Sequence, residues 1–253
     1  MDCVKYWNTT KQNSKLMRFS IIVPTYNERQ TIGLLVRAFF DVLPSASMLV
    51  VDDNSPDKTT EEVASLKNEF PRLDFLLRTS DRGFGRSYRD ALIKLVGDDR
   101  YDTVVMMDAD FSHDPKYIPG MFDKLSQCKC KVVTGSRYVS GGGAEGWGWK
   151  RVLLSHLASF YLRLILGVPV RDVTSGFFVF NKSVLASIDL VSLHSMGTAI
   201  LVELKYKLFK AGHKIYEYPI VVVDRTQGQS KISKKLIWES LKLPLKLRFS
   251  RLK

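Results

Sequence analysis

The chain has 253 residues, 45% of them hydrophobic, so it is long enough to bury a full core within a single α/β domain. Its formal net charge of +12 indicates attraction to an anionic partner, which nucleic acid, a membrane surface or a phosphorylated substrate would satisfy. Nine lysines and arginines but a single acidic residue, Glu239, lie between Arg225 and Lys253, so +8 of the +12 is confined to the last 29 residues.

The start of the chain carries no targeting signal that we can identify. Residues 1–18 are polar and lack the apolar run of a signal peptide, so we expect them to form an N-terminal extension. No uncharged apolar stretch reaches the ~18 to 20 residues of a spanning helix, which favours a soluble or peripheral protein. Three cysteines, Cys3, Cys128 and Cys130, form no CxxC pair and predict neither a disulfide framework nor a zinc site. They indicate a reducing compartment.

Short β-branched runs alternate with helical patterns along the chain, beginning with a strand at 19–24 and a helix that carries Ile32, Leu35 and Phe39 on one face. This alternation predicts a mostly parallel sheet with helices on both faces, in which ligands bind beyond the carboxyl ends of the strands. The further strands are expected at 48–51, 74–77, 103–107, 132–134, 177–180 and 215–223, the further helices at 61–70, up to Val96, at 151–166 and at 197–210, and a mobile glycine-rich loop at 141–148.

Two acidic clusters follow predicted strands. Asp108 and Asp110 come directly after the fourth strand and offer hard oxygen ligands suited to Mg²⁺ or Mn²⁺, which would bridge the phosphates of a nucleotide. A cation there would neutralise charge that develops on a diphosphate leaving group. Asp52 and Asp53 end an earlier strand and would reach a base or ribose at the same edge. For both clusters the alternative is an ordinary solvated turn.

Guanidinium groups are suited to binding phosphate oxygens in a bidentate manner, and this topology gathers several arginines on one side. The segment from Asp224 to Lys231 is the most specific of these signals, because two cations, a hydroxyl and a flexible glycine follow a buried strand. The arginines in or near these loops are Arg78, Arg82, Arg86, Arg137, Arg151 and Arg225.

Seven motifs occur in an order that resembles the dolichol-phosphate mannosyltransferases of glycosyltransferase family 2, and the resemblance spans about residues 19–235. Each motif is weak alone, but their order and spacing make the signal specific. The motifs are Pro24-Thr25-Tyr26-Asn27-Glu28, the run from Val51 to Asp57, the run from Met107 to His113, Gly135-Ser136-Arg137-Tyr138, Gly146-Trp147 with Lys150-Arg151, the run from Asp172 to Phe177, and the run from Asp224 to Lys231.

The resemblance implies an α/β fold of the GT-A type that binds a nucleotide sugar, over residues 19–230. It also implies inverting transfer of mannose from GDP-mannose to a polyprenyl (dolichyl-type) phosphate, with Mg²⁺ or Mn²⁺ as cofactor. The implied roles are donor binding by Pro24, Tyr26, Glu28, Asp53 and Asp108; metal binding by Asp108 and Asp110; acceptor or phosphate binding by Arg137, Arg151, Ser175, Arg225 and Lys231; and a catalytic contribution from Asp110, Arg137 and Arg225. Leu201 departs from the family pattern, where a polar glutamine usually stands two residues before Glu203.

Two segments favour contact with a membrane surface. The helix at about 151–166 has a wide apolar arc, typical of a core helix or of one that lies on a membrane, as the corresponding helix does in the family. The C-terminal segment 231–253 is basic and amphipathic with a tryptophan, although Pro244 interrupts it. We therefore expect a cytoplasmic protein bound peripherally to the cytosolic face of an anionic membrane. A small membrane-anchoring subunit is a further expected partner.

Other functions stay open at this stage. A related family 2 enzyme would use UDP-glucose or another donor, or a non-lipid acceptor, and an inactive protein would bind the nucleotide sugar without transfer. Nucleic-acid binding is disfavoured because no recognised motif accompanies the basic tail. A dehydrogenase is disfavoured because Gly83 and Gly85 follow the third strand and lack the G-x-G-x-x-G spacing.

Overall fold

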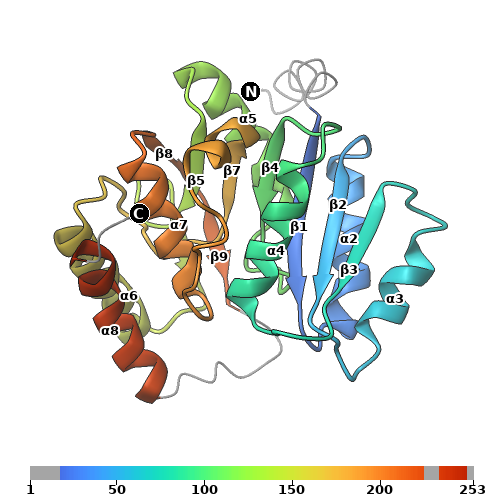
Figure 1. Ribbon diagram of the computed structural model, residues 1–253, viewed down its shortest axis with the longest axis horizontal. Coiled ribbons are helices and arrows are strands. Elements are labelled where there is room, and N and C mark those ends of the chain that lie inside the picture. The colour runs from blue at the N-terminus through green and yellow to red at the C-terminus, as the bar shows by residue number, and fades with distance from the viewer. Residues whose placement is uncertain (1–17, 225–233, 250–253) are drawn as a thin grey trace.

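The computed structural model describes residues 18–224 and 234–249, and these form a three-layer α/β structure (Figure 1). A seven-stranded sheet lies between helices on both faces, with the strand order β3-β2-β1-β4-β7-β5-β8. The predicted α/β class with a mostly parallel central sheet is confirmed.

The bounds of the elements agree with most of the predicted ones. The strands are β1 Phe19–Thr25, β2 Ser47–Asp52, β3 Leu73–Leu77, β4 Thr103–Met106, β5 Val132–Ser136, β6 Gly143–Glu145, β7 Phe178–Asn181, β8 Ile215–Pro219 and β9 Val221–Val223. The helices are α2 Arg29–Val42, α3 Thr59–Leu66, α4 Phe84–Val96, α5 Ile118–Cys128, α6 Trp149–Leu166, α7 Ala199–Lys210 and α8 Lys234–Phe249, with short 3-10 helices η1 Pro115–Tyr117 and η2 Lys182–Ser187.

One strand runs against the others, and this decides where the site forms. β7 pairs antiparallel with both β4 and β5, whereas the remaining neighbours in the sheet pair in parallel. The amino end of β7 therefore lies beside the carboxyl ends of β4 and β5, where Phe178 faces Met106 on one side and Thr134 on the other. The segment that precedes β7 thus reaches the edge at which ligands bind in parallel sheets.

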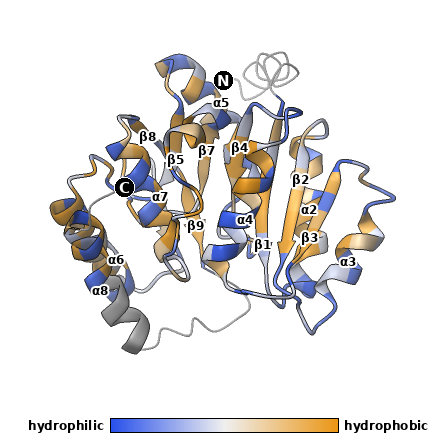
Figure 2. Cartoon of the chain, in the orientation of Figure 1, coloured by the Kyte–Doolittle hydropathy of each residue, from blue (hydrophilic) through white to orange (hydrophobic). Residues whose placement is uncertain are grey.

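The sheet is buried on both faces, which explains the continuous apolar runs of its central strands (Figure 2). Alternate residues of each strand enter different cores. In β1, Ile22 packs into the core beneath α4 and α7, while its neighbours Ile21 and Val23 pack into the core beneath α2, α3 and α5.

Several local features differ from the predictions. The strand predicted at 215–223 is broken at Ile220, because β8 joins the main sheet while β9 pairs with β6 in a separate two-stranded sheet. Part of the predicted glycine loop therefore forms β6. Helix α5 was not predicted. The sequence predicted no disulfide framework, and the structure has a single disulfide that joins Cys128 and Cys130, two residues apart.

Helices α6 and α8 pack side by side at one end of the molecule (Figure 1). Only Ser159, Leu162 and Leu166 of α6 are buried, so most of its apolar arc faces outward. Pro244 does not interrupt α8, which continues through it to Phe249. None of the helices within residues 18–224 and 234–249 is long and apolar enough to cross a membrane.

Gly85 supplies a close approach between α4 and the segment before α7. A Cβ atom at this position would lie 2.5 Å from the backbone carbonyl oxygen of Ser195. We predict that Gly85→Ala destabilises the protein by about 1 to 3 kcal/mol in urea unfolding, because the backbone must shift to admit the methyl group. Gly97→Ala is the control, since a Cβ there would meet its nearest atom at 3.9 Å. Equal stabilities of the two variants would contradict this account of the packing.

Candidate active site

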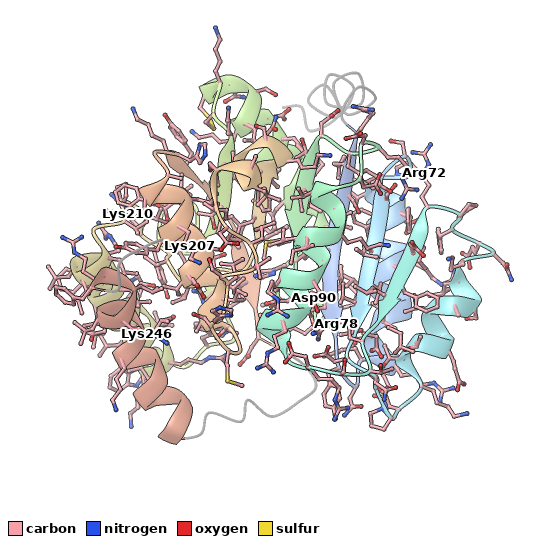
Figure 3. All side chains as sticks on the ribbon, viewed as in Figure 1. Arg72, Arg78, Asp90, Lys207, Lys210 and Lys246 are labelled. Carbon is pink, nitrogen blue, oxygen red and sulfur yellow. A yellow bond between two sulfur atoms is a disulfide. The ribbon has the colours of Figure 1, made fainter. Side chains whose placement is uncertain are left out.

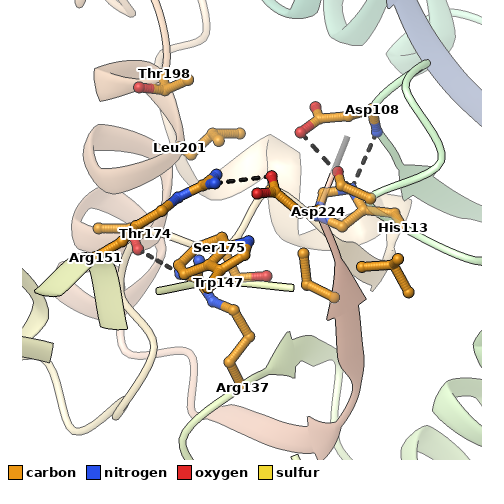
Figure 4. A pocket seen from close by; sticks show the side chains of 14 residues that line it. Asp108, His113, Arg137, Trp147, Arg151, Thr174, Ser175, Thr198, Leu201 and Asp224 are labelled. Atoms are coloured by element: carbon orange, nitrogen blue, oxygen red, sulfur yellow. Dashed lines mark hydrogen bonds and ion pairs between the residues drawn. The ribbon is translucent and has the colours of Figure 1, made fainter. Parts of the chain in front are cut away.

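A pocket opens at the edge of the sheet where β4 and β5 end and β7 begins (Figure 4). It is partly open to solvent and draws its walls from segments far apart in the sequence. The lining residues are Asp108, Ser112, His113, Arg137, Trp147, Arg151, Thr174, Ser175, Gly176, Thr198, Leu201, Val222, Val223 and Asp224. Four predicted site residues, Asp108, Arg137, Arg151 and Ser175, are thus brought together.

Asp108 is held by contacts on both its backbone and its side chain. The Tyr88 hydroxyl donates to Asp108 Oδ1 at 3.3 Å, and the Asp108 backbone amide donates to His113 Nδ1 at 3.1 Å. Burial, together with the neighbouring Asp108 carboxylate, raises the pKa of Tyr88 well above its usual value, so this hydroxyl stays protonated. Burial lowers the pKa of His113, which is therefore neutral at pH 7 and stacks on Phe177. The carboxylate orientation of Asp108 is consequently fixed.

Asp110 lies on the same loop but is not among the lining residues. Its Oδ1 accepts a hydrogen bond from the Ser112 amide at 3.0 Å, which closes the turn after β4. Within the described parts of the chain, no group of three or more His, Cys, Asp or Glu side chains is arranged to hold a metal ion. Two carboxylates on one turn nevertheless fit Mg²⁺, which proteins usually bind through one or two carboxylates while water and substrate phosphates complete its shell.

A buried ion pair anchors the opposite wall of the pocket. Arg137 donates from Nε and Nη2 to the two carboxylate oxygens of Asp172, both at 2.7 Å, and its backbone amide donates to the same carboxylate at 3.0 Å. Arg137 Nη2 also donates to the Thr174 hydroxyl at 2.8 Å. Burial alone would raise the pKa of Asp172, but the hydrogen bonds and charge of Arg137 outweigh it and lower the pKa.

Arg151 and Trp147 complete the cationic wall. The guanidinium carbon of Arg151 lies 4.0 Å from the centre of the Trp147 ring, and that of Arg137 lies 5.2 Å from it, so the indole contacts both cations. Arg151 Nη1 also forms a 2.7 Å ion pair with Asp224, in which both side chains are partly exposed (Figure 4). The direction of Arg137 is therefore fixed by Asp172, Thr174 and Trp147, whereas a phosphate can compete with Asp224 for Arg151.

The family is established by comparison with known proteins. The family model of glycosyl transferase family 2 matches residues 20–189. The chain belongs to glycosyltransferase family 2. It is 36% identical over 230 residues to the polyprenol monophosphomannose synthase of Mycolicibacterium smegmatis, covering 88% of this chain and 84% of that protein. It is 34% identical over 225 residues to the undecaprenyl-phosphate mannosyltransferase of Micrococcus luteus, covering 89% and 91%.

Solved structures show the same fold. Glucosyl-3-phosphoglycerate synthase from Mycobacterium tuberculosis, in complex with Mn²⁺, UDP and phosphoglyceric acid, matches with a TM-score of 0.69 at 17% identity, covering 96% of this chain and 82% of that one. The complex of that enzyme with Mg²⁺ and UDP matches with a TM-score of 0.68, covering 96% and 83%.

Apart from Asp108, the predicted donor residues of the glycosyltransferase lie at the same sheet edge but outside the pocket lining. Pro24, Tyr26 and Glu28 occupy the end of β1 and the turn that follows, and Tyr26 is 53% exposed. Asp53 is buried after β2, where it meets the Gly83 amide at 2.6 Å, the Ser87 hydroxyl at 2.9 Å and Arg78. Its contact with a base or ribose stays a prediction.

Arg78, one of the loop arginines of the glycosyltransferase, has an internal role. Its side chain is 4% exposed and pairs with both Asp53 and Asp90, and Figure 3 shows Arg78 and Asp90 facing each other at the base of α4. It therefore ties α4 to the ends of β2 and β3. Arg225 and Lys231 lie outside the described residues; Asp224, which precedes Arg225 in the sequence, lines the pocket.

Sequence reasoning missed several residues that line or support the pocket. Trp147, which lines it, and Asp172, which holds Arg137 from behind, stood within quoted motifs, yet no role was assigned to either. They could have been found as an aromatic and an acidic residue in motifs that accompany arginines. Ring stacking and ion pairing are the interactions that fix a guanidinium group in place. Nothing in the sequence indicated Val222 or Thr198, because they enter the pocket only through the break between β8 and β9 and the placement of α7.

The Arg137–Asp172 pair is buried, with side chains 11% and 0% exposed, so removing one partner leaves an uncompensated charge. We predict that Asp172→Ala lowers the free energy of unfolding by about 3 to 5 kcal/mol at pH 7. Because the folded-state pKa of Asp172 lies below its usual value of 3.8, the wild-type advantage is complete above pH 3.8 and disappears as the pH falls through the lowered pKa.

Urea unfolding at pH 7 and at progressively lower pH measures this difference. Asp102→Ala serves as the control, because Asp102 pairs with Arg18 through side chains that are 54% and 61% exposed. Solvent screens such a pair, so little change is expected. A similar loss in the two variants would show that the Arg137–Asp172 pair carries no special weight.

Proposed function

We propose that this glycosyltransferase transfers mannose, with inversion, from GDP-mannose to a polyprenyl (dolichyl-type) phosphate. Two curated relatives of similar length, named as mannosyltransferases of polyprenyl phosphates, support the substrates. The observation that carries the proposal is a pocket with one acidic and one cationic wall, formed by Asp108 on one side and by Arg137 and Arg151 on the other. Such a pocket suits a diphosphate bound through a cation next to a second phosphate bound directly.

The donor would bind along the ends of β1, β2 and β4. Asp108 and Asp110 would hold Mg²⁺ or Mn²⁺, which when bound neutralises charge on the departing diphosphate. Tyr88 and His113 keep Asp108 oriented before the donor arrives, so no rearrangement of that carboxylate is required. Pro24, Tyr26, Glu28 and Asp53 would line the nucleotide side.

The acceptor phosphate would bind to Arg137, Arg151 and Ser175 and attack the anomeric carbon as the nucleotide diphosphate leaves. A phosphate oxygen is already anionic at neutral pH, so the reaction needs positioning and charge neutralisation more than a strong base. Neutral His113 uses Nδ1 to accept the Asp108 amide, which suits a structural role. Arg225 and Lys231 would close over the phosphates from the segment after Asp224.

A transfer assay with identified lipid product tests the proposal. GDP-mannose and UDP-glucose are each offered with a short polyprenyl phosphate and with phosphoglyceric acid, in the presence of Mg²⁺ or Mn²⁺. Mannosyl phosphoryl polyprenol is the expected product. Preferred use of UDP-glucose, or of the non-lipid acceptor, would replace the proposed substrates, and the absence of transfer from every pair would favour a binding protein.

Mutation should distinguish the two carboxylates after β4, Asp108 and Asp110, from the nearby Asp114, which is not expected to bind the metal. We predict that Asp108→Asn and Asp110→Asn each lower kcat by about 100-fold or more, because the leaving diphosphate loses its cation. Binding of Mn²⁺ together with GDP should weaken in parallel. Asp114→Asn is the matched control, since asparagine can still cap η1 through the Lys116 amide, and the ion pair lost with Lys116 is solvent-exposed. Near-normal turnover without either Asp108 or Asp110 would exclude the metal assignment.

We further propose peripheral binding to the cytosolic face of an anionic membrane, through α6 and α8. Trp149, Leu154, Leu157, Phe160 and Leu164 project from α6 with exposures of 55% to 72%, a density of apolar side chains suited to the headgroup boundary. The basic C-terminal segment 231–253 would add electrostatic attraction. A small membrane-anchoring subunit is a candidate for the same face, and nucleic acid is not a proposed partner.

Liposome flotation tests whether the protein binds the membrane through α6. We predict that Leu154→Glu reduces binding to vesicles containing anionic lipid by several-fold, because a charge on the apolar face of α6 opposes insertion. Leu34→Glu is the matched control, since Leu34 is 64% exposed on α2 and Leu154 is 66% exposed on α6. Equal flotation of the two variants would place the membrane contact elsewhere.

A further inference from the structure

Lys205 is a fully buried lysine on α7, with 0% of its surface exposed. Its ammonium group donates to the backbone carbonyl oxygen of Val173 at 3.0 Å and to that of Ser175, and it lies 4.2 Å from the centre of the Phe178 ring. Burying a lysine is costly unless its donors are satisfied, and here both contacts fall on a single short segment. Lys205 does not line the pocket, so it is not placed to contact substrate.

The segment held by Lys205 is the one that precedes β7 and forms the acceptor wall. Asp172 fixes Arg137, Thr174 contacts the same guanidinium, and Ser175 lines the pocket. From the other side, the Glu217 carboxylate of β8 accepts the amides of Arg171 and Asp172 at 2.9 and 3.0 Å. The segment is thus held by hydrogen bonds to Glu217 at its start and to Lys205 at its end.

We propose that Lys205 is a positioning residue for the phosphate subsite, which holds the segment from Asp172 to Gly176 so that Arg137 and Ser175 meet the acceptor phosphate together. This inference rests on the proposed function, because it takes Arg137 and Ser175 to be the residues that bind the acceptor phosphate. In physical terms, the hydrogen bonds from Lys205 to the carbonyl oxygens of Val173 and Ser175 fix the backbone of the segment, and this backbone in turn positions Arg137 and Ser175.

The charge of Lys205 is finely balanced. Burial lowers its pKa to about 7, while Asp172 and Glu217 favour the charged form and Arg137 opposes it. The charged form in turn helps keep the pKa of Asp172 low, which preserves the ion pair with Arg137. A neutral amine still donates hydrogen bonds but gives a weaker grip, because hydrogen bonds from a charged donor are about twice as strong.

Lys205→Met tests the proposal with kinetics that separate acceptor from donor. We expect the KM for a short polyprenyl phosphate to rise about tenfold at pH 6, because the segment loses its charge-assisted contacts. The kcat and the KM for the nucleotide sugar should change by less than about twofold, since Asp108 and its supports are untouched. The thermal unfolding midpoint is measured alongside.

The pH dependence distinguishes positioning from a general structural role. The acceptor phosphate titrates equally for both proteins, so the ratio of the acceptor KM values, variant over wild type, isolates Lys205. This ratio should fall between pH 6 and pH 8.5, because the wild type loses its own charge there. Lys205→Gln, which keeps a hydrogen-bond donor without the charge, should give a smaller ratio that falls over the same pH range, because the wild type is the common reference, and it serves if Lys205→Met does not fold.

Lys207→Met is the matched control on the same helix. Lys207 donates to the Ser192 carbonyl and hydroxyl and pairs with Glu203, and it is labelled in Figure 3. The Lys207→Met variant should have the same KM for the acceptor as the wild type.

Acceptor KM values within twofold of wild type for both Lys205 variants would overturn the inference while leaving the proposed function intact. A loss shared equally by kcat and both KM values, with a ratio independent of pH, would overturn it as well. If the wild type transfers to no polyprenyl phosphate, the proposed function fails by itself. Calorimetric binding of inorganic phosphate then still tests Lys205, with weaker binding by Lys205→Met expected and equal binding contradicting the inference.

Discussion

The fully buried carboxylate of Asp172 is the constraint on which the pocket depends. A charge in such a place must be matched, and it is matched by the side chain and backbone amide of Arg137, which follows β5, and by the Thr174 hydroxyl, while Lys205 contacts the same segment. Glu217 of β8 holds the backbone of Asp172 in turn. The segment that carries Asp172 thereby joins the end of β5, the start of β7 and helix α7.

The two walls of the pocket differ in how they are supported. Asp108 is held by neutral groups, the hydroxyl of Tyr88 and the imidazole of His113, which leave its charge available to a cation. Arg137 is held by the charged carboxylate of Asp172 and by the Thr174 hydroxyl, which fix its direction and leave its remaining donors for an anion. In the proposed reaction, this division would let each of the two phosphate groups be neutralised by a different partner.

Helix α6 differs from the other helices because several of its leucines face outward. α7 buries residues over most of its length, whereas α6 buries only Ser159, Leu162 and Leu166. Its periodicity did not reveal which of the two roles it had, since a wide apolar arc is compatible with a core and with a lipid surface. The lack of a covering layer over α6 in the described part of the chain is a tertiary property.

The sequence by itself determined the alternation of strands and helices, the acidic turn at Asp108 and the family, because these depend on local periodicity and on motifs that remain readable in one dimension. Only the tertiary structure decided that β7 runs antiparallel, that Trp147 touches two arginines and that Lys205 holds the segment beside them. The physical reason is that strand direction and the partners of a buried charge depend on which distant segments meet, and hydrophobic patterning specifies burial without specifying the neighbour.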